Sequence, residues 1–288
     1  MAWAFRFSKT NHGRAEELGL IERENVPRLL SLFEYYAVPV TWATVGHLFL
    51  ESCKKGANIR PHADMPRPEY FENSNWNFAV GDWYDSDPCS DFKKAPAWYA
   101  PDLIDLITQS PVGHEIGCHT FSHIDCNDKY CSTELLKAEL EASIKVASVR
   151  NIRLSSMVFP GGTLGNYSIL KEMGFTCYRK IMKYNVDIPA LDQYGLVQIP
   201  SSHTLLRSYF SWPAKRYIRM AKSYIKKASN HKMVAHLWFH PSMDPWFIEN
   251  VLPEILAFIR KMADAGKVEI LTMKQLSDKF INNTSKIA

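Results

Sequence analysis

The sequence has little excess of either charge and no long apolar run. Its 288 residues carry a formal net charge of +4, with basic and acidic residues interspersed. That bias is too small to favour nucleic acid or an acidic polymer as a partner. No window approaches the roughly 18 uninterrupted apolar residues that predict a membrane-spanning helix, so we expect none. Arg6, Lys9 and Arg14 interrupt the apolar core that an N-terminal signal peptide would need.

Closely paired cysteines are also absent. The six cysteines are spread along the chain, and none of them forms a Cys-x-x-Cys motif. In a chain of this size without an export signal, free thiols are the default. We therefore expect a cytoplasmic protein without disulfide bonds.

Aspartate is missing from the start of the chain, where none precedes Asp64. The opening stretch Met1–Phe7 is apolar and aromatic, with no carboxylate. It predicts either a strand or a chain that begins partway through an element.

The pattern that is present predicts an α/β fold. Apolar runs of strand length alternate with helical stripes, which is typical of a parallel sheet. The predicted strands are 38–45, 112–117, 154–159, 175–180, 196–201, 233–239 and 268–271. The predicted helices are 22–36, 98–109, 132–149, 168–173, 212–228, 246–265 and 274–280. About seven parallel strands without a linker-like break predict one domain over residues 1–288, a (β/α) barrel.

One segment, at about 51–97, does not fit this alternation. It is dense in proline, asparagine, aspartate and tryptophan and is too long for a plain connection. We interpret it as a long loop insertion, a functional loop or lid over a site. Its aromatic residues could stack on sugar faces or could simply pack the loop down; they are Trp76, Trp83, Tyr84, Trp98 and Tyr99.

His119 and His123 are the strongest chemical signal in the sequence. They lie four residues apart, directly after the predicted strand 112–117. Four residues is just over one helical turn, so both imidazoles can face one point. Two imidazoles favour a divalent metal site, which usually needs a third protein ligand and an open position. The alternative is a coincidence of spacing.

Other polar groups follow other predicted strands. In a parallel barrel the carboxyl ends of the strands carry the chemistry. The loop Pro160-Gly161-Gly162 follows one strand, Arg179 ends the next, and His240 follows strand 233–239. His236 shares a strand face with His240 but lies deeper, so we interpret it as a core histidine. Arg179 could orient a carboxylate or the substrate, or could only pair with a nearby acid.

Three stretches resemble the polysaccharide deacetylase family of metal-dependent sugar deacetylases. His119-Thr120-Phe121-Ser122-His123, preceded by Glu115-Ile116-Gly117, resembles its zinc-ligand motif, and Leu237-Trp238-Phe239-His240-Pro241 resembles its last motif. The helix-to-strand passage at 34–42 is similar to the family's as well. The resemblance implies a distorted (β/α) barrel.

The resemblance also implies roles for these residues. His119 and His123 would hold a divalent metal, expected to be zinc, although cobalt and iron accept the same ligands. His240 would protonate the leaving amine. Beside these family roles, we expect Arg179 and Trp238 to bind the substrate. A backbone N–H of the loop Pro160-Gly161-Gly162 would stabilise the oxyanion, although glycines stand where the family usually carries an arginine.

The family's two adjacent aspartates at the first strand have no counterpart here. Either the chain begins after that strand, or it is a diverged member that lost its base and third ligand. The other motifs are largely kept, and a barrel missing a strand exposes costly edges, so we favour the first explanation. Less favoured substitutes for the third ligand are Asp82, Asp125 and the thiols of Cys126 and Cys131.

The sequence therefore predicts a metal-dependent hydrolase with a carbohydrate substrate. We expect it to remove an N-acetyl group from an amino sugar of a surface glycan or its precursor. Two alternatives stay open. One is a different hydrolase of carbon–nitrogen bonds on the same barrel, acting on a small linear or cyclic amide. The other is a catalytically inactive sugar-binding protein.

Overall fold

A computed structural model describes residues 1–56, 60–69, 71–72, 75–78, 81–182, 184–206 and 212–284. Its centre is a sheet of six strands in the order β1-β4-β5-β6-β8-β7. The strands are β1 (Thr41–Thr44), β4 (Glu115–Cys118), β5 (Ser156–Met157), β6 (Cys177–Met182), β7 (Ala190–Leu191) and β8 (Val197–Ser201). All neighbours pair in parallel except β7, which runs antiparallel to β8. The predicted α/β fold with mostly parallel strands is confirmed.

A second, parallel pair continues the wall of the sheet. Strand β9 (His203–Thr204) follows β8 after Ser202 and pairs with β10 (Leu237–Trp238). In the described residues no ladder joins β10 back to β1, so the strands form an open barrel wall. The predicted strand 268–271 is wrong, because these residues run outside any ladder before the last helix.

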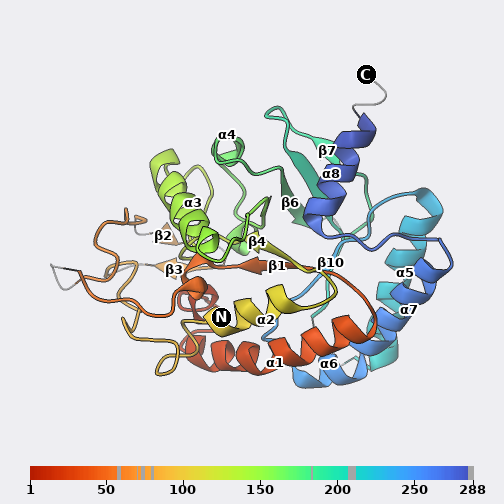
Figure 1. The fold of residues 1–288 in the computed structure, drawn as a ribbon, viewed down its shortest axis with the longest axis horizontal. Coiled ribbons are helices and arrows are strands. Elements are labelled where there is room, and N and C mark those ends of the chain that lie inside the picture. Colours follow the sequence, from red (N-terminus) through yellow and green to blue (C-terminus); the bar gives the residue numbers. More distant parts are fainter. Residues whose placement is uncertain are drawn as a thin grey trace.

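Helices surround the strands (Figure 1). They are α1 (Ala15–Tyr35), α2 (Pro101–Gln109), α3 (Thr133–Ser148), α4 (Tyr167–Glu172), α5 (Ala214–His231), α6 (Pro245–Asn250), α7 (Leu252–Asp264) and α8 (Met273–Thr284). Short 3₁₀ turns η1 (Ala2–Ala4), η2 (Gly46–Phe49) and η3 (Pro160–Gly162) occupy loops, and β2 (Phe71–Glu72) pairs with β3 (Asn77–Phe78). This β2–β3 hairpin lies with the other loops of segment 51–97 at one end of the molecule.

Most predicted helices and strands differ from the structure by a few residues at their ends, and the predicted strand 233–239 is reduced to β10. Helix α1 begins at Ala15, before the predicted start at 22, so Pro27 lies in its interior. The predicted helix 246–265 is two helices, because Pro253 lacks an N–H and occupies the first turn of α7. Met1–Phe7 contains the 3₁₀ turn η1 and no strand.

Helix α3 shows how local sequence positions the site loops. Its cap residue Ser132 accepts a hydrogen bond from the N–H of Leu135 at 3.2 Å. Leu135, Leu136 and Leu140 form the buried stripe that packs the helix into the main core, next to η2 and α4. Glu139 lies within the same stripe and is fully buried, which places a carboxylate beneath the loop that follows β4.

The aromatic residues of segment 51–97 form part of the main core. Trp83, Tyr84 and Tyr99 are at most 1% exposed, and Trp76 and Trp98 are each 5% exposed. Of the two interpretations, stacking on sugars and packing the loop, the structure supports packing. A second core lies between α1, α5 and α7. In the described residues no helix has the length and hydropathy needed to cross a membrane.

Candidate metal and catalytic site

His119 lies directly at the carboxyl end of β4. Its backbone N–H donates to Thr44 O at 3.0 Å, which continues the ladder with β1. Its ring nitrogen Nδ1 lies 2.5 Å from the carbonyl oxygen of Val158. Because a carbonyl only accepts, Nδ1 carries the ring proton and Nε2 presents its lone pair. A metal-binding imidazole is commonly oriented by a bond of this kind.

His123 lies in the loop that follows, packed against His119. The two rings are 4.8 Å apart between centroids, and the Trp76 ring lies 5.1 Å from that of His123. Thr120 and His123 both adopt left-handed backbone conformations, with φ of 57° and 60°. The two histidines therefore lie in a tight loop and not on a helix. This loop brings the two imidazoles together, as the sequence predicts.

Glu139 anchors this loop from below. Its carboxylate accepts from the Ser122 N–H at 2.7 Å, from the Ser122 hydroxyl at 2.6 Å and from the Tyr84 hydroxyl at 2.9 Å. Trp83 donates its indole N–H to the same hydroxyl of Ser122. Glu139 is not among the predicted site residues, although an acidic residue inside an apolar helical stripe is a signal that could have identified it.

Burial keeps both imidazoles neutral. Desolvation lowers the pKa of His119 to about 3, despite the bond to Val158. The pKa of His123 lies well below its ordinary value because of burial and the neighbouring His119. Neutral imidazoles with free lone pairs are what a divalent metal requires. The pair therefore fits two ligands of such an ion.

A third ligand does not accompany the pair in the described part of the chain. The one group of three or more histidine, cysteine, aspartate or glutamate ligands found there lies elsewhere and excludes both histidines. Asp82 is held by Arg67 at 2.9 Å, and Asp125 accepts from the N–H of Asn127 at 2.8 Å. Neither proposed substitute, nor the thiols of Cys126 and Cys131, completes the set.

His119, Arg179, Trp238 and His240 line one cavity of about 720 Å³. His240 lies two residues after β10, at an exposed position on this cavity. Partial withdrawal from water lowers its pKa; the nearby Arg179 acts in the same direction and Glu22 of α1 in the opposite one. The predicted acid and one predicted metal ligand therefore share a cavity, although they come from β10 and β4.

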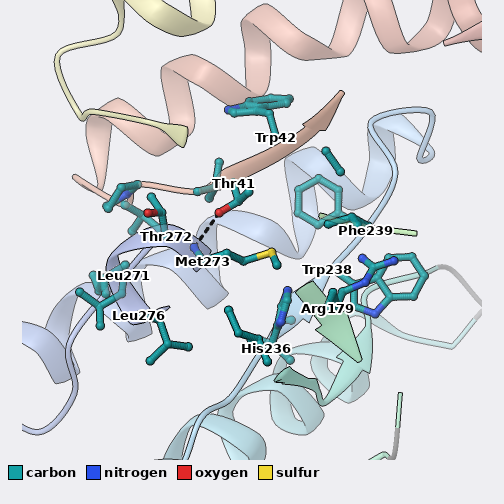
Figure 2. Close-up of a pocket in the computed structure, with 18 of the residues that line it drawn as sticks. Thr41, Trp42, Arg179, His236, Trp238, Phe239, Leu271, Thr272, Met273 and Leu276 are labelled. Atoms are coloured by element: carbon teal, nitrogen blue, oxygen red, sulfur yellow. Dashed lines mark hydrogen bonds between the residues drawn. The ribbon is translucent and has the colours of Figure 1, made fainter. Parts of the chain in front are cut away.

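Figure 2 shows side chains that line this cavity, Arg179, His236 and Trp238 among them. The Arg179 guanidinium lies 4.4 Å from the centroid of the Trp238 ring, and burial lowers its pKa to about 10. No carboxylate partner for Arg179 occurs among the described ion pairs, so its predicted pairing with a nearby acid is not seen there. His236 lies beside it, and its Nδ1 has no hydrogen-bond partner among the described residues.

The loop Pro160–Gly162 forms the 3₁₀ turn η3. Gly161 and Gly162 have positive φ values of 57° and 73°. The Gly162 N–H donates within the turn to Phe159 O at 3.1 Å. Asn75 donates its amide to the carbonyl of Gly161 at 3.0 Å. A Cβ at Gly161 would lie 2.9 Å from the Trp76 ring, which explains why glycine stands there.

Glu22 was also missed at the sequence level. It is 5% exposed on α1, lines the same cavity and forms an ion pair with the amino group of Met1. The helix that carries Glu22 was predicted. The cavity that this helix faces could not be predicted, because its position depends on how α1 packs against the strands. Glu22 brings a negative charge to the cavity wall near His240.

Comparison with known proteins agrees with this architecture. The family description "Polysaccharide deacetylase" matches residues 17–178, more than half of the chain. The chain belongs to the polysaccharide deacetylase family and is a hydrolase that acts on carbon–nitrogen bonds other than peptide bonds. The match includes His119, His123 and the loop Pro160–Gly162. No curated protein sequence matches the chain.

Two solved structures share the fold. A candidate polysaccharide deacetylase from Mycobacterium smegmatis superposes with a TM-score of 0.60 at 16% identity, covering 90% of this chain and 78% of its own. PuuE allantoinase superposes with a TM-score of 0.56 at 15% identity, covering 88% of this chain and 71% of its own. At such low identity these likenesses concern the fold alone.

Proposed function

We propose that the protein removes an N-acetyl group from an amino sugar of a surface glycan or its precursor. The observation that carries the proposal is the convergence of His119, Arg179, Trp238 and His240 on one cavity from different strands. Family membership supports a deacetylase, and the mixed apolar and polar lining suits a sugar with its acetyl group.

His119 and His123 would hold a divalent ion, zinc by the chemistry of the donors. When bound there, such an ion would polarise the acetyl carbonyl and lower the pKa of a bound water. The orientation of His119 by Val158 O supports this role, because it leaves Nε2 as the ligating atom. The loop held by Glu139 keeps the second imidazole beside the first.

His240 would donate a proton to the leaving amine nitrogen. Its exposed position on the cavity lets it meet substrate, and Glu22 favours its protonated form. Arg179 and Trp238 would bind the sugar, Trp238 through its ring and Arg179 through its guanidinium. In η3 the Gly162 N–H is already used, so the Gly161 N–H is the donor we assign to the developing oxyanion.

Acetate release from N-acetylated oligosaccharides tests the proposal. His240→Gln should lower kcat by about 10²–10⁴-fold with metal content unchanged. His119→Gln should lose both activity and the metal held by the pair. The control His231→Gln, an exposed histidine on α5, should keep both.

Other outcomes separate the rival functions. Saccharide binding without acetate release in the unmodified protein would contradict a deacetylase and support a sugar-binding protein. Hydrolysis of small linear or cyclic amides, with no action on acetamido sugars, would instead support the other carbon–nitrogen hydrolase.

A further inference from the structure

A second group of metal-ligand side chains lies outside the cavity. It consists of His47 in η2 and Cys53, His62 and Asp87 in segment 51–97. One ligand atom from each residue lies within 4.8 Å of all the others. Asp87 Oδ2 is the centre, 2.9 Å from His47 Nε2, 2.8 Å from His62 Nε2 and 3.2 Å from Cys53 Sγ.

The donor set is the one that tetrahedral zinc takes. Two imidazoles, a thiol and a carboxylate give four ligands, the number found in closed structural sites. Zinc–nitrogen and zinc–sulfur bonds of about 2.0 and 2.3 Å place tetrahedral ligand atoms roughly 3.3–3.8 Å apart. The three distances to Asp87 Oδ2 are slightly shorter than this range, and the 4.8 Å limit on the distances between the four ligand atoms is longer. Small side-chain movements would therefore bring the four atoms to tetrahedral positions around an ion.

Surrounding groups orient the two most buried ligands. The second oxygen of Asp87 accepts from the Tyr99 hydroxyl at 2.7 Å and from the Cys89 N–H at 2.9 Å, which leaves Oδ2 facing the group. His47 Nδ1 lies 3.3 Å from the carbonyl oxygen of Trp98. That carbonyl accepts the ring proton when Nε2 binds a metal, as the outer partners of metal-bound histidines do.

The same residues also form a metal-free hydrogen-bonded network, in which the Trp3 indole donates to His47 Nδ1 at 3.0 Å. In that arrangement His47 donates its Nε2–H to Asp87. Burial tends to raise the pKa of Asp87, but hydrogen bonds from both histidines reverse this and hold it well below its ordinary value. The carboxylate is therefore ionised in either arrangement, and the thiol is the group that a metal would recruit.

We propose that His47, Cys53, His62 and Asp87 form a structural zinc site. None of the four lines the cavity of His119 and His240, and all four positions of the ion are filled by protein, so the ion does not meet substrate. It joins η2 to three separated points of segment 51–97. On binding, the Cys53 S–H bond breaks, sulfur bonds to zinc and one proton enters solvent. The His47 proton moves from Nε2 to Nδ1, where Trp98 O accepts it, and the Trp3 indole N–H gives up its bond to that nitrogen. His62 likewise carries its proton on Nδ1.

Cobalt(II) is the probe that identifies this site. Cys53 supplies a thiolate, whereas His119 and His123 do not, so a sulfur-to-cobalt charge-transfer band reports on this group alone. The intact protein and its His119→Gln, His123→Gln double variant should both show the band with about one cobalt per chain bound at this group. Cys53→Ser should abolish the band, and Cys89→Ser, a neighbouring thiol outside the group, should keep it.

Proton release provides a second measurement, which does not require the Cys53→Ser variant to fold. At pH 8, where free imidazoles are neutral, zinc titration of the double variant should release about one proton per ion bound. Cobalt binding without a thiolate band, or a band that survives Cys53→Ser, would overturn the proposal. Loss of all metal in the double variant would also overturn it. Acetate release does not enter either measurement, so this inference and the proposed function fail independently.

Discussion

His236 should make the protein less stable in mild acid. Burial, with the nearby Arg179, lowers its pKa to about 3, whereas an unfolded histidine titrates near 6.5. Between these values the unfolded chain binds a proton that the folded chain does not. Because the pKa of His236 is lower in the folded protein than in the unfolded chain, protonation favours the unfolded chain. The free energy of unfolding therefore falls as the pH drops below about 6.5, and this histidine does not affect it at higher pH.

The magnitude follows from the two pKa values. At pH 5 the unfolded histidine is almost fully protonated, and the linkage amounts to about 2 kcal/mol for this one side chain. Urea unfolding at pH 7.5 and pH 5 measures it, with His236→Gln as the non-titrating variant. The unmodified protein should lose about 2 kcal/mol more than the variant between the two pH values.

Other buried histidines, His119 among them, also lose stability in acid, but they contribute equally to both proteins and cancel in the difference. His231→Gln removes an exposed histidine and should keep the full pH dependence. An equal loss of stability in His236→Gln and the unmodified protein would refute the assignment of a neutral, desolvated imidazole to the cavity wall.

Three further variants test other parts of the site. Glu139→Ala leaves three donors without their acceptor and should lower the free energy of unfolding by on the order of 3 kcal/mol, against no change for the exposed Glu141→Ala. Gly161→Ala should lower activity and stability more than Gly162→Ala, because both residues have positive φ but only at Gly161 does the Cβ meet a ring at 2.9 Å. Glu22→Gln removes the charge that favours protonation of the proposed acid, so the alkaline limb of the kcat profile should move to lower pH.

Local pattern was sufficient to predict most strands and the histidine pair. The apolar runs 38–45, 112–117, 175–180 and 196–201 contain or overlap β1, β4, β6 and β8, so these strands could be predicted directly. The run 268–271 has the same composition but forms no ladder in the structure. Pairing depends on a neighbouring strand edge, which composition does not encode.

The group around Asp87 could not be found from spacing. His47, Cys53, His62 and Asp87 are separated by unequal intervals and lie mostly in a segment without helical or strand periodicity. Recognisable metal motifs place ligands at fixed short intervals on one turn or hairpin. Here an irregular loop brings the residues together, so the arrangement depends on tertiary contacts that the sequence does not display.

The positions of the two sites are linked through the backbone. Gly46 donates its N–H to Thr120 O at 2.8 Å, and His47 donates its N–H to Phe121 O at 2.9 Å. Thr120 and Phe121 stand between His119 and His123, so η2 fixes the loop that carries both imidazoles. Since His47 belongs to the proposed zinc site, an ion there would restrain that loop without entering the cavity. Segment 51–97 contacts the same loop directly, because Trp83 donates to the Ser122 hydroxyl and the Trp76 ring packs against His123. Its buried aromatic residues therefore help to hold the histidine loop in place.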